Sequence, residues 1–199
     1  MTPQQDSAAI KSAIRQKYAE VAVSAAGKFQ YPTGREGAEL LGYGRALIQS
    51  APPQLLVSFC GVGNPFLLQV IPHGSAVLDV GCGAGFDMYV AGQLVGDQGR
   101  VCGIDLTDEM ASLARKNLAK AGISNVEIKK VDMEHIPYPD HSFDVVISNG
   151  VINLSPSKQT MFNEIYRVLK PDGTLQFADV VLEQDLPAEL SGSADAWAQ

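Results

Sequence analysis

Hydrophobic and polar positions follow two different patterns in this chain of 199 residues, with a change near residue 76. From residue 76 onward, short apolar runs alternate with segments whose apolar residues recur at helical spacing. This alternation is typical of parallel sheets with helices on both faces. The sequence therefore predicts an α/β fold with a doubly wound, mainly parallel sheet of about five strands. These strands are expected at 76–80, 100–105, 126–131, 143–148 and 174–181.

Helices are expected between these strands at 86–95 and 108–121, and a third helix is expected to begin at the Ser155-Pro156 pair. Thr107 suits the N-cap of the second of these helices, because its hydroxyl can accept an otherwise unpaired backbone N–H. Proline is favoured at the first helical position, which makes Ser155 the expected N-cap of the third helix.

Residues 1–75 have a different character. Apolar residues recur on one face of residues 1–26, so a helix is expected there, with Gly27 ending it. Residues 28–75 are rich in glycine and proline, and only short helices are expected, at about 36–42 and 53–58. A segment with so many breakers does not build its own core. We therefore expect residues 1–75 to form a helical lid over an α/β domain of residues 76–199.

Composition narrows the classes of function. The net charge of −7 and the absence of a basic run argue against nucleic-acid binding. No apolar run approaches the roughly 18 residues of a membrane span, and the polar first residues do not form a signal peptide. Cys60, Cys82 and Cys102 are too scattered for a disulfide framework, and no metal site is predicted. A reduced, cytoplasmic protein is the expectation.

The stretch Val77–Gly85 organises the second region. A buried strand runs directly into a glycine-rich turn with Gly81, Gly83 and Gly85, and a helix follows from Phe86. The glycines allow a tight turn and a close approach of backbone to ligand, and the helix start directs free N–H groups at that ligand. This arrangement begins a nucleotide-binding type of α/β domain.

Informative residues follow four of the predicted strands, at the sheet edge where such folds bind ligands. Asp105 can bind both hydroxyls of a ribose, which fits NAD and S-adenosylmethionine alike. Asp79 favours S-adenosylmethionine, because a buried carboxylate repels a pyrophosphate but attracts a sulfonium and an ammonium group. Asp132 and Met133 are expected at the adenine, and Asn149 near the methionine moiety.

Each of these residues also has a purely structural interpretation. Asp79 could cap the turn, and Asp105 could cap the next helix. Met133 could be a core residue, and Asn149 could tie off a loop.

The sequence resembles class I S-adenosylmethionine-dependent methyltransferases over about residues 76–181. Val77–Gly85 is similar to their first motif, and Asp105, Asp132-Met133 and Arg167–Gly173 fall where later motifs stand. The resemblance implies S-adenosylmethionine as cofactor and a small-molecule methyl acceptor. The predicted cofactor-binding residues are Tyr18, Asp79, Gly81, Cys82, Gly83, Asp105, Leu106, Asp132, Met133 and Asn149.

A narrower resemblance is to arsenite methyltransferases. It is carried by Cys82–Asp87, Asp105–Met110, Ser148–Pro156 and Gly63-Asn64-Pro65. It implies that Tyr18 lies over the cofactor. Such enzymes bind trivalent arsenic through three cysteine thiolates, and this sequence departs from them in that respect.

Cys60 is a shifted match to one of these ligands, and Gly150 stands where another is expected. Cys82 lies in the cofactor turn and Cys102 inside a strand, so neither replaces a missing ligand. Arsenite is therefore the less favoured acceptor, and a thiol or another metalloid stays open. Direct displacement at the methyl carbon needs no metal and no strong base for such acceptors, so no catalytic residue is assigned.

The resemblance also implies a seven-stranded sheet that ends in a hairpin, whereas this sequence supplies five strands. Strand 174–181 would then be an exposed apolar edge. The reading frame could end at a UGA codon that encodes selenocysteine, the chain could have been cut deliberately, or a second copy could cover the edge in a homodimer. The alternative function is a cofactor-binding module that cannot turn over, and a dehydrogenase is disfavoured by Asp79.

Overall fold

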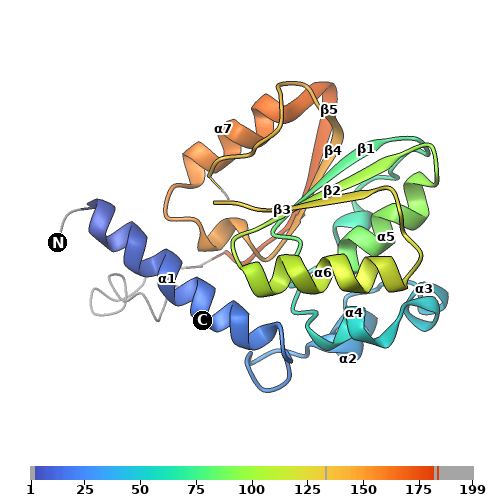
Figure 1. Cartoon of the computed structure of the whole chain (residues 1–199), viewed down its shortest axis with the longest axis horizontal. Helices are drawn as coiled ribbons and strands as arrows, with labels where there is room; N and C mark the ends of the chain where they lie inside the picture. Colours follow the sequence, from blue (N-terminus) through green and yellow to red (C-terminus); the bar gives the residue numbers. More distant parts are fainter. Residues whose placement is uncertain (1–2, 133, 182, 184–199) are drawn as a thin grey trace.

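The computed structural model describes residues 3–132, 134–181 and 183, and contains a five-stranded sheet in which every pairing is parallel. The strand order is β3-β2-β1-β4-β5, so the order reverses between β1 and β4 (Figure 1). This topology confirms the predicted doubly wound α/β fold. The strands are β1 Ala76–Val80, β2 Arg100–Asp105, β3 Val126–Lys130, β4 Phe143–Asn149 and β5 Leu169–Ala178.

Helices bury both faces of this sheet. α5 (Phe86–Val95) and α6 (Asp108–Lys120) lie on one face, and α7 (Lys158–Val168) lies on the other (Figure 1). Successive strand residues point to opposite faces, so Val77 packs in the core beneath α5 while Leu78 packs in the core beneath α7. All five residues of β1 are buried, which explains why four of them are apolar and why Asp79 is the exception.

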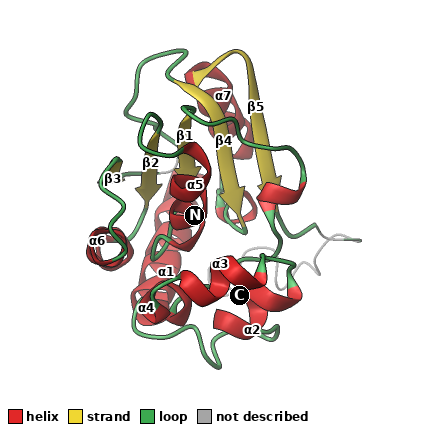
Figure 2. Cartoon of the chain, turned by 90° about the vertical axis from the view of Figure 1, so that its right-hand side faces the viewer, coloured by secondary structure: helices red, strands yellow, loops and turns green. Residues whose placement is uncertain are grey.

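The N-terminal helices lie beyond the carboxyl ends of the strands, as Figure 2 shows for α2, α3 and α4. Apolar side chains of these helices and their connections, including Tyr43, Ile48 and Leu55, belong to the same core as Phe86 and Met88 of α5. This shared core agrees with a lid that depends on the sheet domain, although the boundary at residue 75 stays a prediction. The elements are α1 Pro3–Val21, α2 Gly34–Leu40, α3 Arg45–Ser50, α4 Pro53–Val57 and the 3-10 turn η1 Pro65–Leu67.

Two predictions for the lid region were wrong. α1 ends at Val21 and not at residue 26, because the N–H of Ala25 donates to the carbonyl of Val57 and draws the chain toward α4. The helix α3 was not predicted, because a loop was expected between the short helices at about 36–42 and 53–58. Gly44 instead occupies the N-cap position of α3, and Ile48 anchors the helix in the core.

Two elements in the second half, α7 and β5, also have other boundaries than predicted. α7 begins at Lys158, because Ser155 closes the 3-10 turn η2 (Ile152–Leu154) and its hydroxyl donates to Glu134 at 2.8 Å. β5 begins at Leu169, which pairs with Phe143, and a shift of register follows, near Asp172 with φ 64°. Thr174 then lies opposite Val145, and the strand ends at Ala178, short of residue 181.

β5 forms one edge of the sheet, and no strand of the described part of the chain pairs with its outer side. Phe177 on β5 is 40 % exposed, and its ring lies 6.1 Å from that of Phe162 on α7. The predicted homodimer across this edge stays a prediction. Within the residues described, every helix is too short or too polar to cross a bilayer.

Candidate active site

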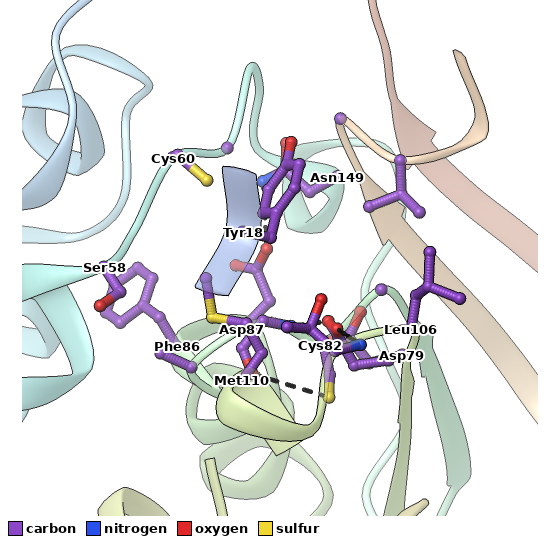
Figure 3. Close-up of a pocket in the computed structure, with 18 of the residues that line it drawn as sticks. Tyr18, Ser58, Cys60, Asp79, Cys82, Phe86, Asp87, Leu106, Met110 and Asn149 are labelled. Carbon is purple, nitrogen blue, oxygen red and sulfur yellow. Dashed lines mark hydrogen bonds between the residues drawn. The ribbon is translucent and has the colours of Figure 1, made fainter. Parts of the chain in front are cut away.

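A cavity lies at the carboxyl ends of β1, β2 and β4, where the strand order reverses. Both regions of the chain line it, since Ile14 and Tyr18 of α1 face the turn that follows β1. Figure 3 shows the labelled side chains converging on this space, with Tyr18, Cys60 and Asn149 at its upper side. Eight of the ten predicted cofactor-binding residues line the cavity: Tyr18, Asp79, Gly81, Cys82, Gly83, Asp105, Leu106 and Asn149.

The turn after β1 is held by backbone hydrogen bonds to β2. The N–H groups of Gly81 and Cys82 donate to the carbonyl of Ile104, at 2.8 and 3.0 Å. Gly81 has φ 78°, and a Cβ added there would lie 2.3 Å from Cγ2 of Val151, so a side chain has no room. A Cβ at Gly83 would meet nothing within 4 Å, which leaves this glycine bordering open space.

Asp79 lies at the floor of the cavity and is only 2 % exposed. Its Oδ2 is buried and has no hydrogen-bond partner. Burial raises the pKa of this carboxyl well above its usual value, and the carboxylates of Asp87 and Asp105 raise the pKa further. A buried acidic group without a partner is costly, so this oxygen is suited to a polar or cationic ligand.

Asp105 accepts backbone hydrogen bonds from two segments that line the cavity. Its Oδ1 accepts the N–H of Thr107 at 2.8 Å, and its Oδ2 accepts the N–H of Gly83 at 2.9 Å. It therefore fixes both the start of α6 and the glycine turn. Asp105 also lines the cavity, where a carboxylate is suited to accept hydrogen bonds from ligand hydroxyls.

Asp87 at the start of α5 was missed by the sequence analysis. Its carboxylate accepts hydrogen bonds from Tyr43 and Asn149, at 2.6 and 3.0 Å. Burial raises its pKa to about 6, while these two hydrogen bonds lower the pKa. The available signal was a single charge in the otherwise uncharged segment 86–95, because a charged residue is rarely buried without a partner or a function.

Acidic groups dominate the electrostatics of the cavity. Asp79, Asp87 and Asp105 are among the described residues that line it. No lysine, arginine or histidine is among the lining residues that the structure describes. A pyrophosphate would find no cationic side chain here and would face three acidic ones. The site is therefore suited to a ligand with positive charge.

Cys60 lines the cavity together with Tyr18. Burial raises the pKa of the Cys60 thiol to about 12, and Asp105 adds to this effect, so the group is a neutral thiol at pH 7. The backbone carbonyl of Cys60 accepts a hydrogen bond from Tyr31 at 3.0 Å. Among the residues described, no group of three histidine, cysteine or acidic side chains could hold a metal ion.

The predicted adenine residues lie elsewhere or outside the described residues. The side chain of Asp132 is 46 % exposed and pairs with Lys11 of α1 at 2.7 Å, and it does not line the cavity. Val131 lines it instead. Met133 is outside the described residues, so its role and that of Asp132 stay predictions.

The residues present fit S-adenosylmethionine. The orphaned oxygen of Asp79 and the neighbouring acidic groups suit its positively charged methionine end. The carboxylate of Asp105, which lines the cavity, suits ribose hydroxyls. Leu106, Val131 and Met110 supply apolar surface for a ring.

A Rossmann-like sheet with an acidic cavity at its switch point defines a class of α/β proteins that bind nucleoside cofactors. Residues 71–199 match the family model described as a methyltransferase domain. This match covers more than half of the chain, and the chain therefore belongs to the methyltransferase domain family.

Particular relatives point in the same direction. The chain is 36 % identical over 210 residues to an arsenite methyltransferase of Halobacterium salinarum, covering 98 % of this chain and 54 % of that protein. It is similar to the crystal structure of an arsenic(III) S-adenosylmethionine methyltransferase from Chlamydomonas reinhardtii, with TM-score 0.63 and 33 % identity, covering 84 % of this chain and 58 % of that one. A demethylmenaquinone methyltransferase of Listeria monocytogenes is 35 % identical over 113 residues, covering 56 % of this chain and 47 % of that protein. The chain thus spans about half the length of these relatives.

Lys11 links α1, whose Ile14 and Tyr18 line the cavity, to the segment that follows β3. Its ammonium group pairs with Asp132 at 2.7 Å and also with Glu134. We expect Lys11→Met to speed release of a bound cofactor several-fold and to cost about 1 kcal/mol of stability, since these pairs are only partly exposed. Stopped-flow fluorescence and thermal unfolding measure both effects.

Lys28→Met is the matched control, because it removes an exposed pair with Glu20 that lies away from the sheet. Equal effects of the two variants would contradict a specific role for Lys11 in holding α1 in place.

Proposed function

We propose that this chain binds S-adenosylmethionine in the cavity and transfers its methyl group to a small, uncharged acceptor of the thiol or metalloid type. The observation that carries this proposal is the buried, unpartnered oxygen of Asp79 in a cavity with acidic but no basic lining side chains. Membership of the methyltransferase domain family supports the same conclusion.

Each part of the cavity has a distinct task in this proposal. Asp79 would face the positively charged methionine end, and Asp105 would accept hydrogen bonds from the ribose hydroxyls. Leu106 and the residues at the end of β3 would surround the adenine. Tyr18 of α1 would cover the cofactor from the lid side, and the glycine turn would approach it with backbone alone.

Bound S-adenosylmethionine would supply a methyl carbon activated by its positively charged sulfur. The residues of this chain would orient that carbon, exclude water and hold the acceptor in line. Thiol and trivalent metalloid acceptors bring their own lone pair, so a strong general base is not required. A cavity lined by three carboxyls would reject anionic acceptors.

Arsenite is a specific candidate acceptor because the relatives with arsenite methyltransferase names extend over most of this chain. Cys60 is the described cysteine placed to meet a soft acceptor, since Cys82 belongs to the cofactor turn and Cys102 lies within β2. Action in the cytoplasm, without a nucleic-acid partner, completes the proposal.

Calorimetry with S-adenosylmethionine, S-adenosylhomocysteine and NAD tests cofactor choice. We expect S-adenosylmethionine to bind, S-adenosylhomocysteine to bind more weakly because it lacks the sulfonium charge, and NAD not to bind. Binding of NAD without binding of S-adenosylmethionine would overturn the proposal.

A turnover screen with arsenite, small thiols and small phenols tests methyl transfer. Methylation of a thiol or of arsenite is the expected result. Cofactor binding without turnover of any acceptor would instead support the alternative of a cofactor-binding module.

A further inference from the structure

We propose that Tyr43, Asp87 and Asn149 are positioning residues that hold the Cys60–Gly63 loop against the cavity and thereby set the acceptor side of the site. The catalytic consequence rests on the function proposed above, whereas the structural part does not. The three residues come from the α2–α3 connection, the start of α5 and the end of β4.

Asn149 uses both ends of its side-chain amide within the protein. Its Oδ1 accepts the N–H groups of Val62 and Gly63, at 2.8 and 3.1 Å. Its Nδ2 carries two N–H groups and lies within hydrogen-bond distance of three acceptors, which are the carbonyl of Gly63 at 2.9 Å, Asp87 at 3.0 Å and the Tyr43 hydroxyl at 3.1 Å. With this many protein partners, Asn149 is suited to fix the loop rather than to bind the cofactor directly.

Tyr43 and Asp87 brace the amide from two sides. The Tyr43 hydroxyl donates to Oδ1 of Asp87 at 2.6 Å and lies 3.3 Å from the carbonyl of Gly63. Both residues are buried, so these hydrogen bonds form where water competes little. The result is a polar bracket, made of Tyr43, Asp87 and Asn149, that joins the lid region to α5 and β4.

The loop packs tightly against this bracket. A Cβ added at Gly61 would lie 2.4 Å from Nδ2 of Asn149, and one at Gly63 would lie 2.4 Å from Cβ of Ala178. The backbone therefore approaches β4 and β5 as closely as glycine permits. Any shift of Asn149 must move the loop, because no free space separates them.

Cys60 precedes Gly61 and lines the cavity, so the bracket also determines where this thiol stands. The accessibility of Cys60 consequently reports the position of the loop without any need for turnover. The two other cysteines, Cys82 and Cys102, are buried and provide an internal reference.

The test measures alkylation of Cys60 by iodoacetamide in Tyr43→Phe and Asn149→Ala, with Cys60→Ser identifying the labelled site. We expect alkylation about tenfold faster in both variants, because the loop is released from its bracket. Ser50→Ala is the matched control, since it removes the bond between Ser50 and Tyr89, another link between the lid region and α5, at 3.1 Å. Unchanged labelling in Tyr43→Phe, or equal acceleration in Ser50→Ala, would overturn the proposal.

A reciprocal exchange separates positioning from general destabilisation. In the double variant Asp87→Asn/Asn149→Asp, an amide can again donate to a carboxylate between these two positions. Alkylation of Cys60 should therefore return toward the native rate and be no faster than in Asp87→Asn or Asn149→Asp alone. If the acceleration of alkylation in the double variant equals the combined effects of the two single variants, the three residues do not act as one bracket.

Kinetics test the catalytic part. Because Tyr43 does not line the cavity, Tyr43→Phe should raise KM for the acceptor about tenfold while the Kd of S-adenosylmethionine changes less than twofold. The reverse pattern would refute the assignment to the acceptor side. If the native chain binds no S-adenosylmethionine, the proposed function fails, but the labelling result still decides whether the bracket holds the loop.

Discussion

Asp79→Asn is expected to weaken the binding of S-adenosylmethionine about 100-fold and, at the same time, to stabilise the empty protein by about 1 kcal/mol. The two effects have one cause. The carboxyl of Asp79 is buried beside Asp87 and Asp105, and one of its oxygens has no partner in the empty cavity. An amide of the same shape removes the charge that repels its neighbours, and it also removes the charge that attracts the cofactor.

Calorimetry and thermal unfolding measure the two effects of Asp79→Asn separately. Asp140→Asn is the matched control, because it removes the same charge from an exposed carboxylate paired with Arg167. This control should leave binding unchanged. A variant at Asp79 that loses stability together with affinity would indicate a structural role for this carboxyl, such as capping the turn.

The strands and the cofactor turn could be predicted because their signals are local. β1 and β2 were expected at the residues where the structure has them, since each is a short apolar run next to glycine. The order of strands then brought Asp79, Asp105 and Asn149 to one edge, although they are far apart in the chain. A rule about where parallel sheets bind ligands was sufficient for this part of the site.

The polar bracket could not be predicted because its signal is not local. Tyr43 and Asn149 are separated by 106 positions, and although Asn149 was singled out in the sequence, nothing there pairs it with Tyr43 or with Asp87. The ion pair of Asp132 could not be predicted for a related reason, and its place at the adenine stays a prediction. Its carboxylate is paired with Lys11, which lies 121 positions away on a helix that the sequence placed only as a lid.

Raising the pH from 5 to 7 is expected to tighten the binding of S-adenosylmethionine by about tenfold or more, with little change above pH 7. The folded-state pKa of Asp87 is raised to about 6, mainly by burial, and that of Asp79 is also raised. The empty cavity therefore holds at least one proton near pH 5. A cationic ligand favours the ionised carboxylates, so binding releases that proton and becomes easier as the proton concentration falls.

The groups around this pair support the assignment of the proton to the carboxyls. Tyr43 and Asn149 donate to Asp87 and oppose the rise of its pKa. The pKa of the Cys82 thiol and that of the Tyr43 hydroxyl are both raised, which keeps these groups neutral throughout the range. The charge of the ligand itself is constant between pH 5 and 7, because its amine and carboxylate ionise outside this range.

The stability of the empty protein should move in the opposite direction. An acid whose pKa is higher in the folded state stabilises the fold below its unfolded pKa, here the usual 3.8, and loses this contribution as the pH rises through about 6. Stability from Asp87 and Asp79 therefore falls between about pH 4 and 6 while cofactor affinity rises, a combination that ordinary acid denaturation does not produce.

Calorimetry at pH 6 in two buffers with different heats of ionisation counts the released protons directly. A net release close to one proton is expected, and Asp79→Asn should reduce it. Uptake of protons on binding, or an affinity that is constant from pH 5 to 7, would contradict a cavity in which buried carboxyls exchange a proton for the positive charge of the cofactor.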